Sequence, residues 1–496
     1  MVNMFNFTSL SSDPGRLNEI YKETPNVITD EEFIINEIRE FKMSPERQEM
    51  IDGEQYYEGN QAILKKQRTV IGEDGDLQIV ENLPNNLIVD NQYKKMVDQK
   101  NNYLFGKNIV ISPQSEVDNK SDKELPYTTE LKKLFGKRFQ RLLKNIGQDS
   151  INCGIGWMYV NYDDHGELKM KRIKPYQVIP LWSDFEHDEL DGLIYFYPYQ
   201  IGDKTFEKVE VYDENGIHYF TLEDETLTPE EVPHRNYFEL NGEGFNWLKT
   251  PWFGFKFNNK QIPLIRDVKS LQDGINHIVS TFKDNMDEDY RNSIIVLVNY
   301  DGENLGEFRR NLSEYGAVKV RADATTGNGD VKTLQVEVNA QNYEVILKMF
   351  KNALIENAKG YDAKDDRLSG EPNQMNIQSM YSDIDLDADE METEYQAAFE
   401  ELLELVNWHL GEEDELVDVV FNRNVLINET EIIGNLRDSV GILSNRTILE
   451  NHPYVTDVEQ ERTQLEAERQ EELDHLDPYD NMIDRNDVIV DGEENK

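Results

Sequence analysis

The stretch that decides the fold runs from residue 340 to residue 411 and divides into three parts. The first part, AQNYEVILKMFKNALIENAKG (340–360), places apolar residues at three- and four-residue steps, the spacing of one face of an α-helix. Gly360 ends this helix, and a loop follows with the sequence YDAKDDRLSGEPNQ (361–374). The last part, MNIQSMYSDIDLDADEMETEYQAAFEELLELVNWHLG (375–411), keeps the helical period for about nine turns. It therefore predicts a helix about 50 Å long.

The predicted long helix is unusually acidic. Between Leu368 and Asn422 the sequence contains no lysine or arginine, while aspartate or glutamate recurs along the polar face of the helix. Like charges at these spacings repel each other and destabilise an isolated helix. We therefore expect groups outside the helix to stabilise this acidic face.

The whole chain is acidic as well, with 496 residues and a net charge of −47. Proteins that recognise DNA sequence are basic because they neutralise phosphates, so the charge excludes that class. It fits a protein without a nucleic-acid partner, or a conduit whose walls must not hold a duplex. The single cysteine, Cys153, excludes an internal disulfide framework. No apolar run reaches membrane-spanning length and the first residues lack signal-peptide features, so we expect a soluble cytosolic protein.

The first half of the chain predicts helices followed by a β-rich block. Asp30 and Ser44 are candidate caps of two helices, and further helices are predicted over 86–106 and 130–146. Six short aromatic and β-branched runs between residues 155 and 222, separated by Asp-Gly and Asn-Gly turns, predict antiparallel strands. The fold class is therefore α+β and mainly helical.

Two helices flank a small α/β insert in the second half. A helix is predicted over 263–289, and its apolar stripe includes Leu271, Ile275, Ile278 and Phe282. The helix at 340–360 has a stripe that includes Ile346 and Phe350. Because the insert at 291–339 can reverse the chain, we expect the two helices to return antiparallel and to pack along these stripes.

One group of acidic residues is a candidate metal site. Asp383, Asp385 and Asp387, with Glu394 further on, follow the spacing of a calcium-binding loop. Ala388 occupies the position where the sharp turn of such a loop requires glycine, and the helical stripe continues through it. We therefore predict a solvated acidic face and no metal.

Enzyme motifs are missing from the sequence. It contains no phosphate-binding glycine loop, no dinucleotide fingerprint, no zinc-protease motif and no nucleophile elbow, so we predict neither an enzyme nor a cofactor. The carboxylates Asp365 and Asp366 lack an apolar enclosure and are interpreted as a loop tip. Their neighbours Lys364 and Arg367 are the last cations before the acidic helix. Either they contact a partner or they are ordinary solvated loop charges.

Taken together, the chain resembles the portal proteins of tailed bacteriophages, in the branch found in long-tailed phages of Gram-positive hosts. The order of helix, insert, helix, loop and long helix carries the resemblance, together with several short strings. These strings are YLFGK (103–107), GFKFNN (254–259), FNRN (421–424), ILSNRTIL (442–449) and VTD (455–457). The resemblance covers about residues 30–470.

The resemblance implies a ring, usually of twelve copies, at one vertex of the capsid. Such a ring threads double-stranded DNA into the head while a separate terminase hydrolyses ATP, and it serves packaging, retention and ejection of the genome. The other implied partners are the scaffolding protein, the major capsid protein and the head–tail adaptor, with assembly in the host cytoplasm. Repeated carboxylates around a channel would repel phosphate and leave the duplex free to slide.

The resemblance also implies roles for parts of the chain. The loop residues Lys364, Asp365, Asp366 and Arg367 would face DNA, and Arg309 and Arg310 of the insert would contact a partner. The implied parts are a mobile N-terminal arm (1–29), a wing (30–262), a first stem helix (263–290), a clip (291–339), a second stem helix (340–360), a tunnel loop (361–375), a long wing helix (376–411), a crown (412–475) and an acidic disordered tail (476–496).

Two alternatives stay open at this point. The chain could be an acidic structural protein of the capsid or tail that never meets DNA, or, as a more distant alternative, an enzyme that uses surface carboxylates. Size in solution separates the first alternative from a ring, because twelve chains of 57.9 kDa would have a mass of about 700 kDa.

Overall fold

The structure of the chain is a computed structural model, and its compact parts form two units. The larger unit comprises Met1–Tyr361 and Asp383–Asn424, and the smaller unit comprises Asp362–Ser382 and Val425–Lys496. Within them, the structure describes residues 27–71, 75–81, 83–114, 126–184, 187–202, 204–247, 249–289, 294–298, 322–323, 327–328, 330–334, 340–362, 374–412, 415–423, 429–455, 458 and 461–470. The predicted tail at 476–496, and the predicted arm except residues 27–29, lie outside these ranges.

Side-chain caps set the start of the first two helices. Helix α2 spans Glu31–Met43, and the side chain of Asp30 accepts a backbone N–H of its first turn. Helix α3 spans Pro45–Glu58, where Ser44 is the cap and proline occupies the first turn. It ends at Gly59, whose φ of 92° is the left-handed conformation common after a helix. Both predicted caps are confirmed.

The remaining helices of the larger unit supply most of its core. The long acidic helix α11 begins in the smaller unit and continues into the larger one, and its predicted length is confirmed. The helices are α4 (Gln92–Phe105), α6 (Pro126–Leu134), α7 (Lys137–Cys153), α8 (Leu264–Asp289), α10 (Ala340–Asn357) and α11 (Gln374–Leu410), with short 3-10 turns at Val27–Thr29, Ala62–Lys65 and Pro175–Gln177.

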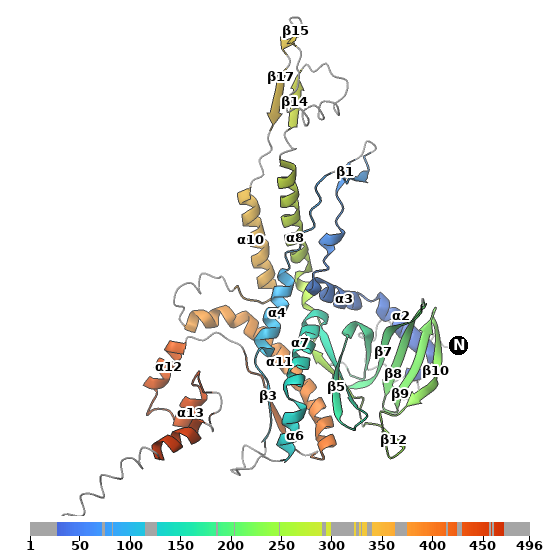
Figure 1. Cartoon of the computed structure of the whole chain (residues 1–496), viewed down its shortest axis with the longest axis vertical. Coiled ribbons are helices and arrows are strands. Elements are labelled where there is room, and N and C mark those ends of the chain that lie inside the picture. Colours follow the sequence, from blue (N-terminus) through green and yellow to red (C-terminus); the bar gives the residue numbers. More distant parts are fainter. Residues whose placement is uncertain are drawn as a thin grey trace, which may run out of the picture. The chain divides into compact units, whose positions relative to one another are not determined.

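Two antiparallel sheets form the β-rich block (Figure 1). One has five strands in the order β10-β9-β8-β7-β6, so each strand pairs with its neighbour in the sequence. The other has the order β13-β4-β5. Their strands are β4 (Ile155–Tyr162), β5 (Leu168–Ile173), β6 (Val178–Trp182), β7 (Leu190–Ile201), β8 (Lys204–Asp213), β9 (Gly216–Glu223), β10 (Thr226–Arg235) and β13 (Trp252–Lys256). The α+β class is therefore confirmed.

Short antiparallel pairs complete the larger unit, and two short helices belong to the smaller one. The pairs are β1 (Thr69–Ile71) with β2 (Leu77–Ile79), β3 (Val110–Pro113) with β18 (Val417–Val420), β11 (Phe238–Leu240) with β12 (Glu243–Phe245), β14 (Ile294–Val298) with β17 (Asp330–Leu334), and β15 (Ala322–Asp323) with β16 (Gly327–Asn328). The short helices are α12 (Glu429–Asp438) and α13 (Asn445–Glu450).

Apolar residues gather into a main core and two smaller clusters. The main core joins α4, α7, α8 and α11 to β4 and β13. A second cluster lies between α2 and the five-stranded sheet, where Ile34 packs near Ile194 and Val209. A third, between the two sheets, contains Trp157, Trp182 and Trp252. The aromatic run at 252–257 is therefore core, as its position between strands and a helix predicts.

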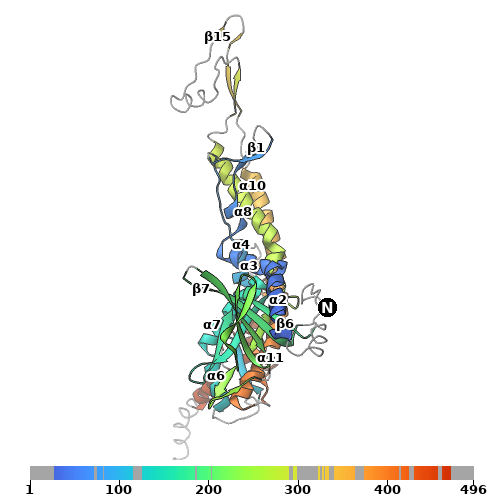
Figure 2. The ribbon, with the colours of Figure 1, turned by 90° about the vertical axis from the view of Figure 1, so that its right-hand side faces the viewer.

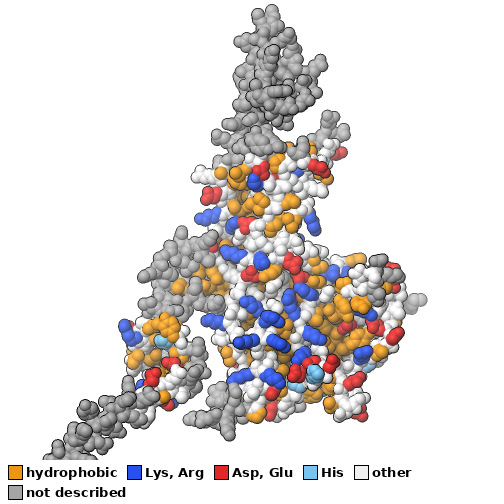
Figure 3. Space-filling view, in the orientation of Figure 1, with side chains coloured by type: hydrophobic (Ala, Val, Ile, Leu, Met, Phe, Trp, Pro, Cys, Tyr) orange, Lys and Arg blue, Asp and Glu red, His pale blue; other side chains and the backbone are white. Residues whose placement is uncertain are grey.

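Helices α7 and α11 lie on opposite sides of the main core. The rings of Phe139 in α7 and Phe399 in α11 meet with their centroids 6.1 Å apart. Figure 1 shows α7 in front, and the side view in Figure 2 places α11 behind it. Lysine and arginine side chains gather on the front, over α4, α6 and α7 (Figure 3).

Two predicted helices are wrong in part. The helix predicted over 86–106 begins only at Gln92, because backbone N–H groups of residues 86–90 bind side chains of α8, which is distant in the sequence. The helix predicted over 130–146 is interrupted between α6 and α7, where Gly136 precedes the first turn of α7 in an extended conformation. Glycine favours such a break because it is a poor helix former.

Candidate functional site

Helices α8 and α10 pack side by side in opposite directions. Near the end of α8, the ring of Phe282 lies against the ring of Tyr343 at the start of α10, with centroids 4.9 Å apart. Farther along, Gly274 of α8 faces Phe350, because a Cβ on this glycine would lie 2.5 Å from Phe350 Cε1. Residue numbers thus rise along α10 as they fall along α8 (Figure 1). The glycine permits the close approach of the two helices.

The residues predicted to pack between the two stem helices differ in how far their side chains are buried. Ile275 is fully buried. Leu271 and Phe350 are half-buried against the main core, and Ile278 and Phe282 are also half-buried. Ile346 differs, since 44% of its surface is exposed in the single chain.

A second face of α8 is polar yet buried. Its four side chains occur at every fourth position and are each 0% exposed: Gln272, Asn276, Ser280 and Asp284. Residues four apart lie on one side of a helix, so these groups form a single row. Burying polar groups is costly unless each finds a hydrogen-bond partner, and a second segment of the chain supplies those partners.

That segment is the strap, which we define as residues 85–91. Four helical residues advance by about 6 Å, and two extended residues advance by about 6.6 Å. A row of side chains at every fourth helical position can therefore bind alternate N–H groups of an extended chain. The observed bonds follow this match: Asp90 N donates to Asn276 Oδ1 at 2.9 Å, Ile88 N to Ser280 Oγ at 3.0 Å, and Asn86 N to Asp284 Oδ1 at 2.6 Å.

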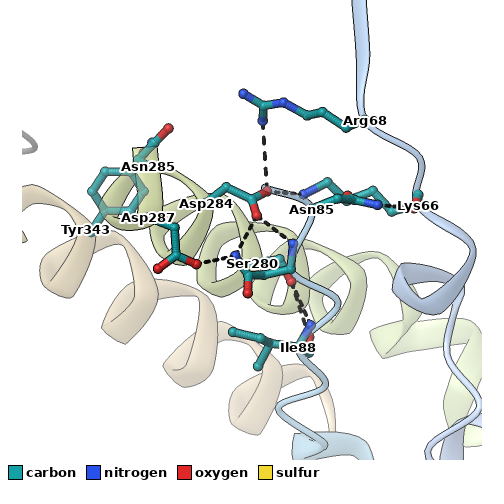
Figure 4. Close-up of polar contacts among 10 residues, drawn as sticks. Lys66, Arg68, Asn85, Ile88, Ser280, Asp284, Asn285, Asp287 and Tyr343 are labelled. Atoms are coloured by element: carbon teal, nitrogen blue, oxygen red, sulfur yellow. Dashed lines mark hydrogen bonds and ion pairs between the residues drawn. The ribbon is translucent and has the colours of Figure 1, made fainter. Parts of the chain in front are cut away.

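Asp284 also ties the base of the β1–β2 hairpin to α8 (Figure 4). Lys66 Nζ lies 2.8 Å and Arg68 Nη1 3.9 Å from its Oδ2. Burial alone would raise the pKa of Asp284, but hydrogen bonds from Lys66 and Asn86 outweigh it and lower that pKa. The carboxylate therefore stays charged near neutral pH and holds the strap, the hairpin and the helix together.

Cations from distant parts of the chain neutralise the acidic helix α11. Lys100 of α4 is 4% exposed, and its Nζ lies 2.5 Å from Asp387 Oδ2. Lys359, just after α10, approaches the same carboxylate at 3.1 Å. These contacts join α4, the end of α10 and α11 at one point. They also correct the prediction of a solvated acidic face at Asp387, which is 9% exposed.

Arg423 neutralises the neighbouring part of α11. Its guanidinium lies 3.0 Å from Asp385 and 2.9 Å from Glu392, and it also pairs with Asp389. Arg423 is the first cation after the long stretch without any, which is the sequence feature that could have identified it. Among the described residues, no group of three or more histidine, cysteine, aspartate or glutamate side chains is arranged to hold a metal ion.

The point where α10 leads into the predicted tunnel loop is fixed. Gln99 of α4 donates from Nε2 to the carbonyl of Tyr361 at 2.9 Å and accepts the Tyr361 N–H at 3.0 Å. Gly360 packs tightly there, since a Cβ would lie 2.7 Å from Met96 Sδ. The chain therefore enters the loop from a defined position against α4.

Several predicted site residues fall outside the described ranges. They are the loop residues Lys364, Asp365, Asp366 and Arg367 and the clip residues Arg309 and Arg310. Within the predicted clip, the structure describes the antiparallel pairs β14–β17 and β15–β16. In the described part of the chain, no helix is both long and apolar enough to cross a membrane.

Known proteins match this sequence along most of its length. Residues 42–475 match the family described as Phage portal protein, SPP1 Gp6-like. The chain is 26% identical over 454 residues to the portal protein of Clostridium phage phiCD119, which covers 88% of this chain and 96% of that relative. It is also 26% identical over 471 residues to the portal protein of Bacillus phage SPP1, with 91% and 89% covered. The chain therefore belongs to the SPP1 Gp6-like family of phage portal proteins.

Proposed function

We propose that this portal protein forms a closed ring of about twelve copies around a channel for double-stranded DNA. Its relatives are portal proteins, which are structural components of the virion. The proposed ring sits at one vertex of the capsid, assembles in the host cytoplasm, and serves packaging, retention and ejection of the genome. In this proposal the ring itself is structural, and a separate terminase supplies the motor.

The observation that carries this proposal is an apolar row that the single chain leaves exposed on its helix pair. Val345, Ile346 and Met349 of α10 are 54%, 44% and 64% exposed, and Met286 of α8 is 53% exposed. Exposed apolar rows of this kind mark contact surfaces. In a closed ring, each copy offers one surface to one neighbour and a different surface to the other. The row on α10 then packs against the helix pair of the adjacent copy.

The charge of the chain supports weak contact with DNA. A net charge of −47 per copy would repel phosphates, so a duplex surrounded by such copies stays free to move. In this proposal the tunnel loop (361–375) projects toward the DNA, where Lys364 and Arg367 meet phosphates briefly. Asp365 and Asp366 keep that contact weak. The fixed position of Tyr361 against α4 would hold the loops of all copies at one level.

The remaining parts receive roles within the same proposal. Residues 30–262 and 376–411 form the wing, 263–290 and 340–360 the stem, and 412–475 the crown. The clip (291–339) docks terminase and later the head–tail adaptor through Arg309 and Arg310, while the outer surface meets scaffolding and major capsid protein. Two adjacent arginines in an acidic chain favour a contact with an acidic partner.

Reversing the loop charges tests the contact with DNA. Phages that carry Lys364→Asp and Arg367→Asp should assemble rings but change the amount of DNA packaged or retained, because phosphate contacts become repulsion. The change should be larger at low salt, where charges are less screened. The measurement is the length of encapsidated DNA at two salt concentrations, with Lys364→Arg and Arg367→Lys as the charge-preserving control. Full-length, stably retained genomes at both salt concentrations would show that these charges do not touch DNA.

A further inference from the structure

One side of the larger unit carries a basic face, which is unusual in so acidic a chain. It comprises the exposed side chains of α6 and the start of α7: Lys132, Lys133, Lys137, Arg138 and Arg141. Within α6, an ion pair joins Lys133 to Glu130 at 3.5 Å. In the described part of the chain, Lys137, Arg138 and Arg141 have no carboxylate partner. Figure 3 shows this concentration of cations.

The opposite side of the unit carries an acidic face on the second half of α11. Its carboxylates are Glu394, Glu400, Glu401 and Glu404 of α11, together with Asp188, which lies just before β7. Two ammonium groups pair with part of this set: Lys249 lies 2.9 Å from Glu404, and Lys256 lies 2.8 Å from Asp188 and 3.6 Å from Glu394. Negative charge therefore remains in excess on this face.

A pocket in the acidic face has the form and charge to receive a long basic side chain. It has a volume of ≈ 200 Å³, and its lining includes the carboxylates of Asp188, Glu394, Glu400 and Glu401, which outnumber the single ammonium group of Lys256. Burial raises the pKa of Glu401 to about 7. The ammonium group of Lys249 opposes this shift, whereas the carboxylates of Asp188 and Glu404 add to it. An additional cation would stabilise this carboxylate in its charged form.

The two faces lie at the same level of the molecule and point in opposite directions. The start of α7 and the second half of α11 lie side by side at this level, because the ring of Phe139 in α7 contacts the ring of Phe399 in α11. With 3.6 residues per turn, Lys137 and Arg141 lie on the side of α7 opposite Phe139. By the same geometry, Glu401 lies on the side of α11 opposite Phe399. Figure 2 shows the two helices on the two sides of the unit.

We propose that the basic face of each copy binds the acidic face of the next copy in the ring. This inference rests on the proposed ring, in which copies are related by rotation alone. A surface can then meet only a surface of its neighbour at the same height, and the two contacting surfaces lie on different sides of the subunit. The two charged faces satisfy both conditions and have opposite sign, which also directs copies to associate in one orientation. An arginine or lysine of the basic face enters the pocket beside Glu401.

Charge reversal on each face tests this contact. The basic reversal is Lys137→Glu, Arg138→Glu and Arg141→Glu together, which leaves the basic face with a net negative charge, and the acidic reversal is Glu400→Lys with Glu404→Lys. These side chains are exposed in the single chain, so each variant should fold normally. Each reversal alone places like charges together and should lower the fraction of chains in rings by about tenfold or more in low salt. Mass photometry measures that fraction, and Lys137→Arg, Arg138→Lys and Arg141→Lys together form the charge-preserving control.

Two rescue experiments separate a lost contact from a folding defect. A chain that carries both reversals has exchanged the sign of its two faces, so it should form rings again. An equal mixture of the two singly reversed chains should also form rings, with the two kinds alternating. Neither rescue is expected of misfolded chains.

The possible failures are distinguishable. If the unmodified chain forms no ring, the proposed function fails together with this contact. If the unmodified and both singly reversed chains form rings equally well, only the contact is wrong. Rings of normal abundance combined with lost binding to DNA or to another phage protein would assign the basic face to that partner instead and would overturn the inference.

Discussion

Replacing Asp387 by leucine is expected to destabilise the chain by about 3–5 kcal/mol, because it leaves a buried ammonium group without its carboxylate. Lys100 is 4% exposed and has Asp387 Oδ2 at 2.5 Å, so water cannot replace the lost partner. Lys359 also loses its contact at 3.1 Å, but it is half exposed and keeps Glu390 nearby. Urea denaturation followed by circular dichroism measures the loss in the free energy of unfolding.

A double variant identifies the cause of that loss. Lys100→Met combined with Asp387→Leu removes both charges and should recover most of the stability, since apolar residues can replace a buried ion pair. Asp389→Leu is the matched control on the same helix. Its carboxylate is 60% exposed and pairs with Arg423 at the surface, so its loss should cost less than about 1 kcal/mol. A double variant as unstable as Asp387→Leu alone would contradict this explanation.

The contribution of the Lys100–Asp387 ion pair to the stability of the chain depends on pH. Burial, only partly offset by Asp387, lowers the pKa of Lys100 below its ordinary value of about 10.4. Between those two pKa values the unfolded chain holds a proton that the folded chain has released, so stability rises with pH across that interval. In Asp387→Leu the attraction is lost, the folded pKa falls further, and the rise should begin at a lower pH.

The second large effect concerns assembly rather than folding. Val345→Asp combined with Met349→Asp should leave the subunit folded and should abolish rings, because the two new carboxylates would be buried in an apolar contact between copies. Both residues are more than half exposed in the single chain, so they contribute little to its own core. The measurements are the unfolding midpoint of the variant and its mass by light scattering.

A matched variant tests whether the position matters. Val232→Asp with Leu240→Asp introduces the same charges at exposed apolar residues of β10 and β11, and it should form rings normally. Ile275→Asp is unsuitable for this purpose, although its stripe predicts a role in packing, because Ile275 is 0% exposed within one chain. Its replacement would report on folding. Normal rings from Val345→Asp with Met349→Asp would show that this row is not between copies.

Periodic segments could be predicted well from the sequence. The apolar stripes of α8, α10 and α11 repeat over many turns, so local residues alone define these helices. The caps Asp30 and Ser44 and the Asp-Gly and Asn-Gly turns act within a few residues, and the elements that they predict are present. These features depend on neighbours in the sequence, which is why a single sequence reveals them.

Features that depend on distant partners could not be predicted. The strap is not helical because Asn276, Ser280 and Asp284 bind its backbone, and nearly two hundred residues separate the two segments. The sequence shows the buried row on α8 only as polar residues beside an apolar stripe. Likewise, Lys100 neutralises α11 from a position 287 residues before Asp387, which nothing in the sequence of α11 indicates.

Electron microscopy of the purified, unmodified protein tests the ring most directly. A closed ring with a central hole, at a mass near 700 kDa for about twelve chains of 57.9 kDa, is the predicted result. The hole must be wide enough for a DNA duplex. Particles the size of one or two chains, without a hole, over the full range of protein concentration and salt, would contradict the proposal that this portal protein assembles by itself into a conduit for DNA.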